Sequence, residues 1–223
     1  MTGHGKKKAR AVRTPRIDMV LASSSPRRRA MLAEAGWRFR VVAPDVVETP
    51  RRGEAPEAFA RRAARDKAAA VAARLGAPTG RRLLVACDTI VVRGRRILGK
   101  PVDAADARRM LRALSGRTHA VISGVCLWMW DGGPRPRRLT FAVRTAVTFR
   151  RLGAGEIAAY VRTGEPMDKA GAYAIQGGAA GMARRLRGSY SNVVGLPMEA
   201  LTERLRRAGW TPAGSRGHGR KTS

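Results

Sequence analysis

Cysteine, aromatic residues and acids are scarce in this sequence, and it has no long apolar run. The two cysteines, Cys87 and Cys126, lie within short apolar stretches, which predicts buried free thiols rather than a disulfide scaffold. No apolar run approaches the roughly 18 residues of a membrane span, and no apolar segment of a secretion signal opens the chain, so we expect a cytoplasmic protein. Phe, Trp and Tyr make up 5% of the chain, too few to provide a stacking surface for single-stranded nucleic acid.

The 16 acidic residues stand against 45 lysines and arginines, which gives a formal net charge of +29. A basic balance favours an anionic substrate or loose association with nucleic acid. Residues 1–15 are polar and lysine-rich and predict a disordered basic arm, residues 16–209 predict one domain, and residues 210–223 predict a flexible basic tail. A basic binding protein of nucleic acid or of cell division is the alternative that this charge leaves open.

Strand-like and helix-like segments alternate as far as residue 115. Strands are expected near residues 19–22, 38–43 and 82–92, and helices after Pro26, over residues 56–75 and after Asp103. Two strand-like runs joined at Asp131-Gly132-Gly133 then predict a hairpin, and helices are expected near residues 156–162 and 197–208. This order predicts an α/β fold with a mixed sheet and a cleft.

The stretch MVLASSSPRRRAML, residues 19–32, predicts a strand, a tight loop and a helix start. Ser25 is a suitable cap and Pro26 suits the first turn, where its missing N–H costs nothing. Free N–H groups at such a terminus, together with Arg27 and Arg28, indicate a binding site for an anion such as phosphate. The same pattern is also typical of a solvent-exposed, well-capped helix.

An acid interrupts the apolar strand LLVACDTIVV. An ionised Asp88 inside such a strand is costly unless a cation, a metal or several donors pair with it. The alternative is that Asp88 marks a strand end that meets solvent.

Cations and carboxylates on several other segments together suit a polyphosphate. Cations neutralise phosphate oxygens, carboxylates hold a divalent ion, and a nearby carboxylate can deprotonate an attacking water. The three histidines are scattered, so no Ser-His-Asp or Cys-His arrangement competes with this hydrolytic chemistry. The candidate groups outside the first helix are Glu48, Lys67, Asp88, Lys100, Asp168 and Lys169.

Taken together, these segments make the chain resemble the Maf family of nucleoside triphosphate pyrophosphatases. The resemblance covers roughly residues 17–205 and implies an extended mixed β-sheet flanked by helices, with two lobes around a cleft, as in inosine triphosphatase-like proteins. It also implies a divalent cation, Mg²⁺ or Mn²⁺, and cleavage of a nucleoside triphosphate into monophosphate and pyrophosphate; it leaves a homodimer open and requires no nucleic acid or membrane. The segments that carry it are LASSSPRRRAMLAEAGWRF, PDVVETP, RRAARDKAAAV, ACDTIVV, ILGKP, MLRALSGRTHAVISGV, YVRTGEPMDKAGAYAIQG and YSNVVGLP.

The resemblance also assigns roles to single residues. Asp88 matches the family's proton acceptor and, with Glu48, supplies the carboxylates for the metal. The sequence departs from the family at Val47, where an aspartate is common, which leaves Glu48 as the only carboxylate there. The other polar positions of the family's cleft, taken with the neighbouring cation Lys169, give the expected substrate-binding set Ser23, Arg27, Arg28, Lys67, Lys100, Asp168 and Lys169.

Three residues bear on the choice of nucleotide. Arg27, Thr89 and Gln176 resemble the members that act on dTTP and UTP, whereas members that act on 7-methyl-GTP differ at these places. An amide and a hydroxyl can pair with the carbonyl and imide edge of uracil or thymine. We therefore expect a pyrimidine nucleotide as substrate, with 7-methyl-GTP as the alternative within the family.

Overall fold

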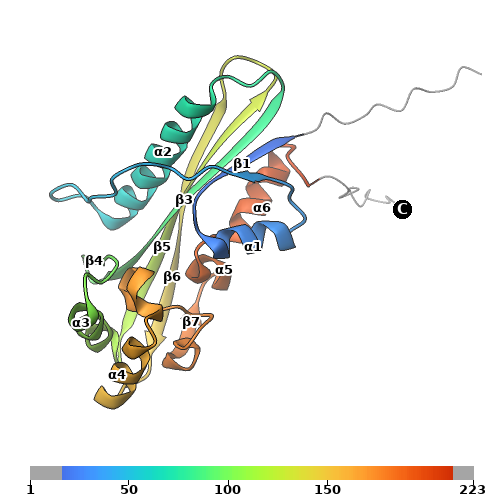
Figure 1. Cartoon of the computed structure of the whole chain (residues 1–223). Helices are drawn as coiled ribbons and strands as arrows, with labels where there is room; N and C mark the ends of the chain where they lie inside the picture. Colours follow the sequence, from blue (N-terminus) through green and yellow to red (C-terminus); the bar gives the residue numbers. More distant parts are fainter. Residues whose placement is uncertain (1–16, 213–223) are drawn as a thin grey trace, which may run out of the picture.

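The computed structural model describes residues 17–212, and the predicted arm at residues 1–15 lies outside this range. A seven-stranded sheet in the order β2-β1-β3-β5-β6-β7 forms its centre, with β4 paired to β3 (Figure 1). β1 runs parallel to β2 and β3, and the other pairs are antiparallel, so the predicted mixed sheet is confirmed. The strands are β1 (Asp18–Ala22), β2 (Arg40–Val41), β3 (Arg81–Arg93), β4 (Arg96–Leu98), β5 (Thr118–Asp131), β6 (Arg137–Phe149) and β7 (Ala183–Arg187).

The helices begin where the sequence supplies caps. The Ser25 side chain accepts from the Arg28 N–H at the start of α1, and Asp103 accepts from the Asp106 N–H, at 2.7 Å, at the start of α3. The helices are α1 (Pro26–Glu34), α2 (Pro56–Leu75), α3 (Ala104–Leu114), α4 (Ala154–Arg162), α5 (Tyr190–Val194) and α6 (Met198–Arg207), with short 3₁₀ turns η1 (Glu165–Asp168), η2 (Ala170–Ala172) and η3 (Ala180–Met182).

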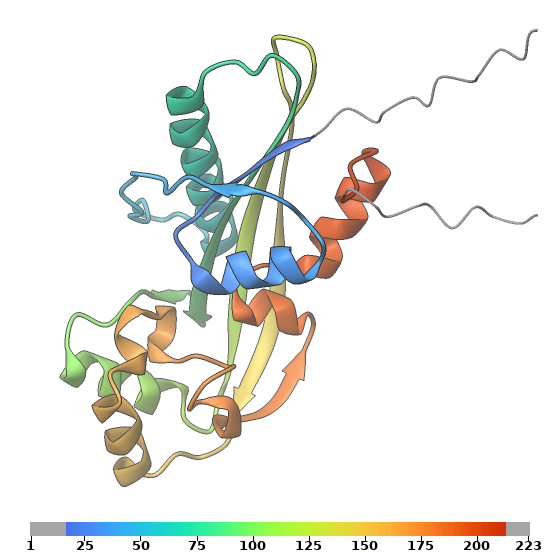
Figure 2. The same cartoon turned by 45° about the vertical axis from the view of Figure 1, so that its right-hand side comes forward.

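Successive residues of β3 face opposite layers of the molecule. Leu83 and Val85 pack in a cluster with α1 and α6, whereas Leu84 and Ala86 pack in a cluster with α2. Figures 1 and 2 show α2 on one side of these strands and α1 with α6 on the other. Because the side chains of a strand alternate, the polar residues that follow Ala86 also project to opposite faces.

The backbone of α2 lies directly against β5 at Gly124, which has no side chain. A Cβ on Gly124 would lie 2.0 Å from the backbone oxygen of Ala60, so no other residue fits there without moving the helix. Gly124 is the register partner of Asp88 in β3. The close approach of α2 therefore occurs beside the one acid of that strand.

A further cluster of apolar side chains forms a separate lobe, the second lobe of the molecule. It lies among α3, α4, the 3₁₀ turns and the lower ends of β5 and β6 (Figures 1 and 2). The first lobe contains α1, α2, α6 and the other half of the sheet, and a cleft lies between the two. No helix within residues 17–212 combines the length and the apolar character needed to cross a bilayer.

The structure differs from the expected elements at three places. Only Arg40–Val41 of the expected strand over residues 38–43 pairs with a neighbour. The hairpin connection is longer than the expected turn and runs from Asp131 to Arg137. Trp210, which the expected tail includes, is 1% exposed and packs in the cluster with α6, so the domain extends past residue 209; residues 213–223 lie outside the described range.

Candidate active site

A gap in the sheet positions the cleft. β1 pairs with β3 as far as Ala22 opposite Ala86, and β4 pairs with it only from Val91 onward, so within residues 17–212 no strand covers that edge of β3 at residues 87–90. Ligands in α/β folds bind in such a crevice at the ends of strands. The cleft here has a volume of about 760 Å³, which suits a small molecule.

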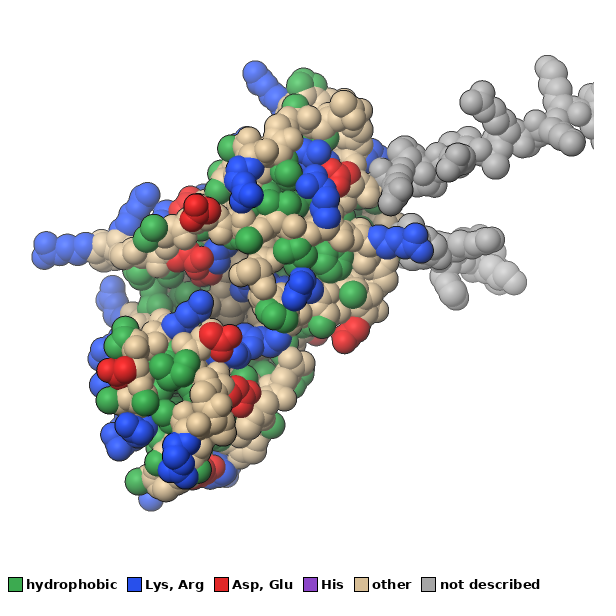
Figure 3. Space-filling view, viewed as in Figure 1, with side chains coloured by type: hydrophobic (Ala, Val, Ile, Leu, Met, Phe, Trp, Pro, Cys, Tyr) green, Lys and Arg blue, Asp and Glu red, His purple; other side chains and the backbone are tan. Residues whose placement is uncertain are grey.

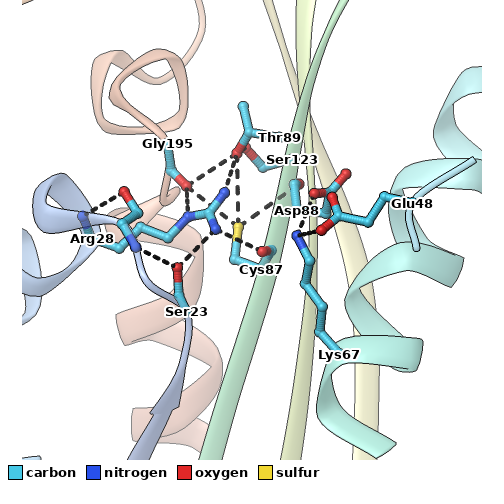
Figure 4. A network of polar contacts seen from close by, with 10 residues as sticks. Ser23, Arg28, Glu48, Lys67, Cys87, Asp88, Thr89, Ser123 and Gly195 are labelled. Atoms are coloured by element: carbon cyan, nitrogen blue, oxygen red, sulfur yellow. Dashed lines mark hydrogen bonds and ion pairs between the residues drawn. The ribbon is translucent and has the colours of Figure 1, made fainter. Parts of the chain in front are cut away.

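Arg28 fills part of the gap and joins three segments of the chain. Its Nη1 donates to the Cys87 carbonyl at 2.8 Å and to the Ser23 hydroxyl at 3.1 Å (Figure 4). Its Nε donates to the Gly195 carbonyl at 2.8 Å, and its Nη2 donates to the Thr89 hydroxyl at 3.1 Å. A guanidinium has five N–H groups, so these four contacts leave one for a ligand.

Lys67 of α2 lies between two carboxylates on the opposite face of β3. Its Nζ is 2.6 Å from Asp88 Oδ1 and 2.8 Å from Glu48 Oε1 (Figure 4). Lys67 is 7% exposed and Asp88 5%, whereas the Glu48 side chain is 38% exposed. The buried acid therefore has the cation that its position in an apolar strand requires.

The two carboxylates differ in their affinity for a proton. Burial acts to raise the pKa of Asp88, but the Lys67 ammonium and the hydrogen bonds of its neighbours outweigh burial, and the pKa is lowered. Burial raises the pKa of Glu48, and the adjacent Asp88 charge raises it further. Asp88 is thus ionised at neutral pH, and Glu48 takes up the first proton as the pH falls.

These carboxylates suit a metal ion that a substrate helps to bind. Within residues 17–212 there is no group of three or more His, Cys, Asp or Glu side chains arranged to hold an ion. Mg²⁺ typically binds through one or two carboxylates and completes its shell with water and phosphate oxygens, which Glu48 and Asp88 can support. Val47, the position where the family often has an acid, is 89% exposed and does not line the cleft.

Cations of the second lobe line the other wall. Lys100 is exposed beside Gly99, and Lys169 forms an ion pair with Asp168. The hydrogen bond from Lys169 lowers the pKa of Asp168, which favours the ionised carboxylate. Positive groups therefore reach the cleft from both lobes, and Figure 3 shows a hollow between the lobes with blue and red side chains around it.

The region that forms the cleft matches a known protein family. The family model described as Maf-like protein matches residues 18–208. The chain belongs to the Maf family. Among Maf-family relatives, a dTTP/UTP pyrophosphatase of Geobacter sulfurreducens is 56% identical over 86% of this chain and 96% of that protein. Another dTTP/UTP pyrophosphatase, from Myxococcus xanthus, is 50% identical over 86% of this chain and 92% of that protein. Among solved structures, a nucleoside-triphosphatase, dITP/XTP pyrophosphatase, of Mycobacterium abscessus matches over 86% of this chain and 96% of its own, with 18% sequence identity and a TM-score of 0.38. This similarity is too low to bear on function.

The Maf-family cleft brings together most of the residues that the sequence singles out. The exception is Gln176, which is exposed and does not line the cleft, although Tyr173, three residues earlier, does line it. The predicted site residues that line the cleft are Ser23, Arg27, Arg28, Glu48, Lys67, Asp88, Thr89, Lys100, Asp168 and Lys169.

Sequence reasoning missed the partners of Thr89. Its hydroxyl accepts from Arg28, lies 2.8 Å from the Ser123 hydroxyl, and donates to the Gly195 carbonyl at 3.1 Å. These contacts hold the Thr89 hydroxyl between Arg28, Ser123 and the Gly195 carbonyl. Ser123 is the register partner of Thr89, a fact that becomes readable only once the pairing of β3 with β5 is known, and a backbone carbonyl has no signature in sequence.

Proposed function

We propose that this chain hydrolyses dTTP, UTP and related modified pyrimidine nucleotides to the monophosphate and pyrophosphate. The observation that carries the proposal is a buried, ionised Asp88 at the open edge of β3, within a cleft that cations line on both sides. The Maf-family relatives that match most of the chain are named for dTTP and UTP, which supports a pyrimidine nucleotide rather than 7-methyl-GTP.

In the proposed reaction, Asp88 accepts a proton from a water that attacks the α-phosphorus. A new bond forms between the water oxygen and phosphorus as the bond to the bridging oxygen breaks, and pyrophosphate leaves with that electron pair. Lys67 keeps Asp88 ionised, while Lys100 and Lys169 neutralise the phosphate oxygens. When bound, a divalent ion held by Glu48 and Asp88 supplies further positive charge at the phosphates.

Thr89 and Gln176 take different parts in the proposed choice of base. Because the Thr89 hydroxyl is held by Arg28, Ser123 and the Gly195 carbonyl, we assign Thr89 a role through Arg28 rather than a direct contact with the base. The Gln176 side chain is exposed, so its amide is free to meet a base that extends from the cleft past Tyr173. Arg27, whose Nε donates to the Val194 carbonyl at 3.2 Å, lines the cleft beside α5.

The Asp88→Asn variant tests the proposed base directly. It keeps the shape of the side chain but removes the proton acceptor, so we expect pyrophosphate release from dTTP with Mg²⁺ to fall by roughly 10²- to 10⁴-fold. Asp131→Asn is the matched control, because Asp131 pairs with Arg81 on the surface and lies outside the cleft. Release at the parental rate by the Asp88 variant would remove the assigned role.

A further inference from the structure

The short turn that carries Gln176 is fastened to the second lobe at both of its ends. At its start, the Ala174 N–H donates to the Tyr160 hydroxyl at 3.1 Å. At its end, the Gly178 N–H donates to Glu165 Oε2 at 3.0 Å. Two side chains outside the turn therefore hold its backbone on either side of the exposed Gln176.

The glycines of this turn allow the backbone to lie against the Glu165 carboxylate. A Cβ on Gly177 would lie 1.7 Å from Glu165 Oε1, and one on Gly178 would lie 3.1 Å from Glu165 Oε2 and 3.0 Å from the Tyr160 ring. A side chain at Gly177 would displace the carboxylate from the turn. The Glu165 carboxylate thus packs directly against the backbone of Gly177 and Gly178, which only glycine allows without displacing it.

Glu165 also connects the turn to the proposed phosphate site. It is the first residue of η1, which ends at Asp168, and Asp168 and Lys169 line the cleft. Tyr160, from α4, is 5% exposed, and burial together with the Glu165 charge raises its pKa to about 12, so its hydroxyl keeps its proton. The Glu165 side chain therefore adds a contact between the segment that holds Asp168 and Lys169 and the turn that carries Gln176, beyond the chain that joins them.

From this geometry we propose that Glu165 and Tyr160 are positioning residues for base selection, because they hold the Gln176 turn at a fixed place relative to Asp168 and Lys169. The inference rests on the proposed pyrimidine nucleotide pyrophosphatase function. Neither side chain needs to touch the nucleotide. Each acts on the backbone of the turn, at positions on either side of Gln176.

The test compares kcat/KM for dTTP with kcat/KM for GTP and 7-methyl-GTP. Glu165→Ala removes the acceptor of the Gly178 N–H, and we expect the preference for dTTP to fall about tenfold, with KM changing more than kcat. Glu165→Gln keeps an acceptor oxygen and should restore most of the preference. Tyr160→Phe keeps the ring and removes only the hydroxyl, so it should lower the preference even if Glu165→Ala folds poorly.

A double-mutant cycle distinguishes the contact from general damage to the lobe. Gly177→Ala should reproduce the effect of Glu165→Ala, and the double variant should lose no more than either single variant, because both changes break the same contact. The matched controls are Glu156→Ala on α4, where Glu156 pairs with Arg150, and Gly181→Ala, where a Cβ meets open space. Both controls should keep the parental preference.

Two results would overturn the inference: a parental preference in Glu165→Ala, Gly177→Ala and Tyr160→Phe, or losses that multiply in the double variant. Failure of the proposed function would be distinguishable from failure of this inference, because the unaltered chain would then release no pyrophosphate from dTTP.

Discussion

At the scale of single residues, the environment of Asp88 decides what the cleft can do. Its carboxylate is buried, and the Lys67 ammonium at 2.6 Å is the main group that stabilises the ionised form there, with help from Glu48 and Arg28. Glu48, at the more exposed end of the same cation, has its pKa raised by burial and by Asp88. Lys67 thus keeps Asp88 ionised, whereas burial and the Asp88 charge dominate at Glu48.

Removal of Lys67 should lower the free energy of unfolding and change the pH profile of kcat/KM. In Lys67→Met the buried Asp88 has lost its partner, and we expect a loss of about 3–5 kcal/mol in the free energy of unfolding. The pKa of Asp88 should rise without the ammonium, which moves the acid limb of kcat/KM to higher pH. Urea unfolding and a pH–rate profile measure the two effects.

Lys100→Met provides the comparison for that variant. Lys100 lies exposed in the same cleft, so its loss should weaken dTTP use while the free energy of unfolding stays within about 0.5 kcal/mol of the parent. Equal stability losses in the two lysine variants would contradict the assignment of Lys67 as the buried partner.

The buried His119 makes the free energy of unfolding depend on pH in a second way, independent of Asp88. Its Nε2 lies 2.8 Å from the Tyr173 hydroxyl, its ring packs edge-on against Phe149, and burial lowers its pKa to about 4. The unfolded chain binds a proton near pH 6.5 and the folded one does not, so stability should fall as the pH drops from about 6.5 to 4, by about 3 kcal/mol in total. Urea unfolding across this range should show a shallower pH dependence for His119→Gln than for the parent; identical slopes would contradict the burial of a neutral imidazole.

At the scale of secondary-structure elements, the contact between α2 and β5 positions Lys67 over Asp88. α2 has seven buried residues in its 20, most of them alanine, and it lies close to the sheet because Gly124 has no side chain. On the other face of β3, α1 places Arg28 against the same strand. The alternation of side chains along β3 therefore directs two successive residues to two different helices.

The Gly124→Ala variant tests this contact. The added Cβ would overlap the Ala60 carbonyl, so α2 must shift, and we expect a loss of about 2 kcal/mol or more in stability together with lower pyrophosphatase activity, because Lys67 moves with the helix. Gly133→Ala, where a Cβ meets nothing within 4 Å, should leave both quantities near the parental values. Thermal unfolding and the dTTP assay would show the proposal wrong if Gly124→Ala matched this control.

At the scale of the whole molecule, the cleft depends on two separate cores. α1, α2 and α6 cover the two faces of one half of the sheet, and α3 with α4 packs at the other end (Figures 1 and 2). Lys and Arg side chains are scattered over the face shown in Figure 3 and do not form one stripe. A small anion that contacts both lobes suits this arrangement better than a nucleic acid that follows a basic track.

A ligand across the cleft should stabilise the folded chain. With a non-hydrolysable α,β-methylene analogue of dTTP at about 100 times its Kd and with Mg²⁺ present, binding adds about 2.7 kcal/mol, which corresponds to a rise in Tm of about 5–10 °C. EDTA should reduce the rise, since Glu48 and Asp88 depend on phosphate oxygens to complete a metal shell. A thermal shift that EDTA leaves unchanged would exclude metal-assisted binding of the analogue.

Local patterns in the sequence determined the elements and the chemical character of the site. The apolar run around Asp88 predicted a buried strand, Ser25 and Asp103 predicted helix starts, and the order of elements predicted a mixed sheet; the structure confirms each of these. These features are readable because caps and side-chain periodicity act over a few neighbouring residues.

Only the tertiary structure decided how those parts meet. The open edge of β3 exists because β1 stops at Ala22 and the three-residue β4 begins later. The sequence predicted the end of β1, but it carried no local signal for β4 or for the pairing of both strands with the same edge of β3. The Gly195 carbonyl reaches Arg28 across 167 positions of the chain, and Gln176 lies outside the cleft lining on a turn that Glu165 holds. Such contacts depend on strand register and long-range packing, which bring together residues whose own neighbours along the chain carry no information about each other.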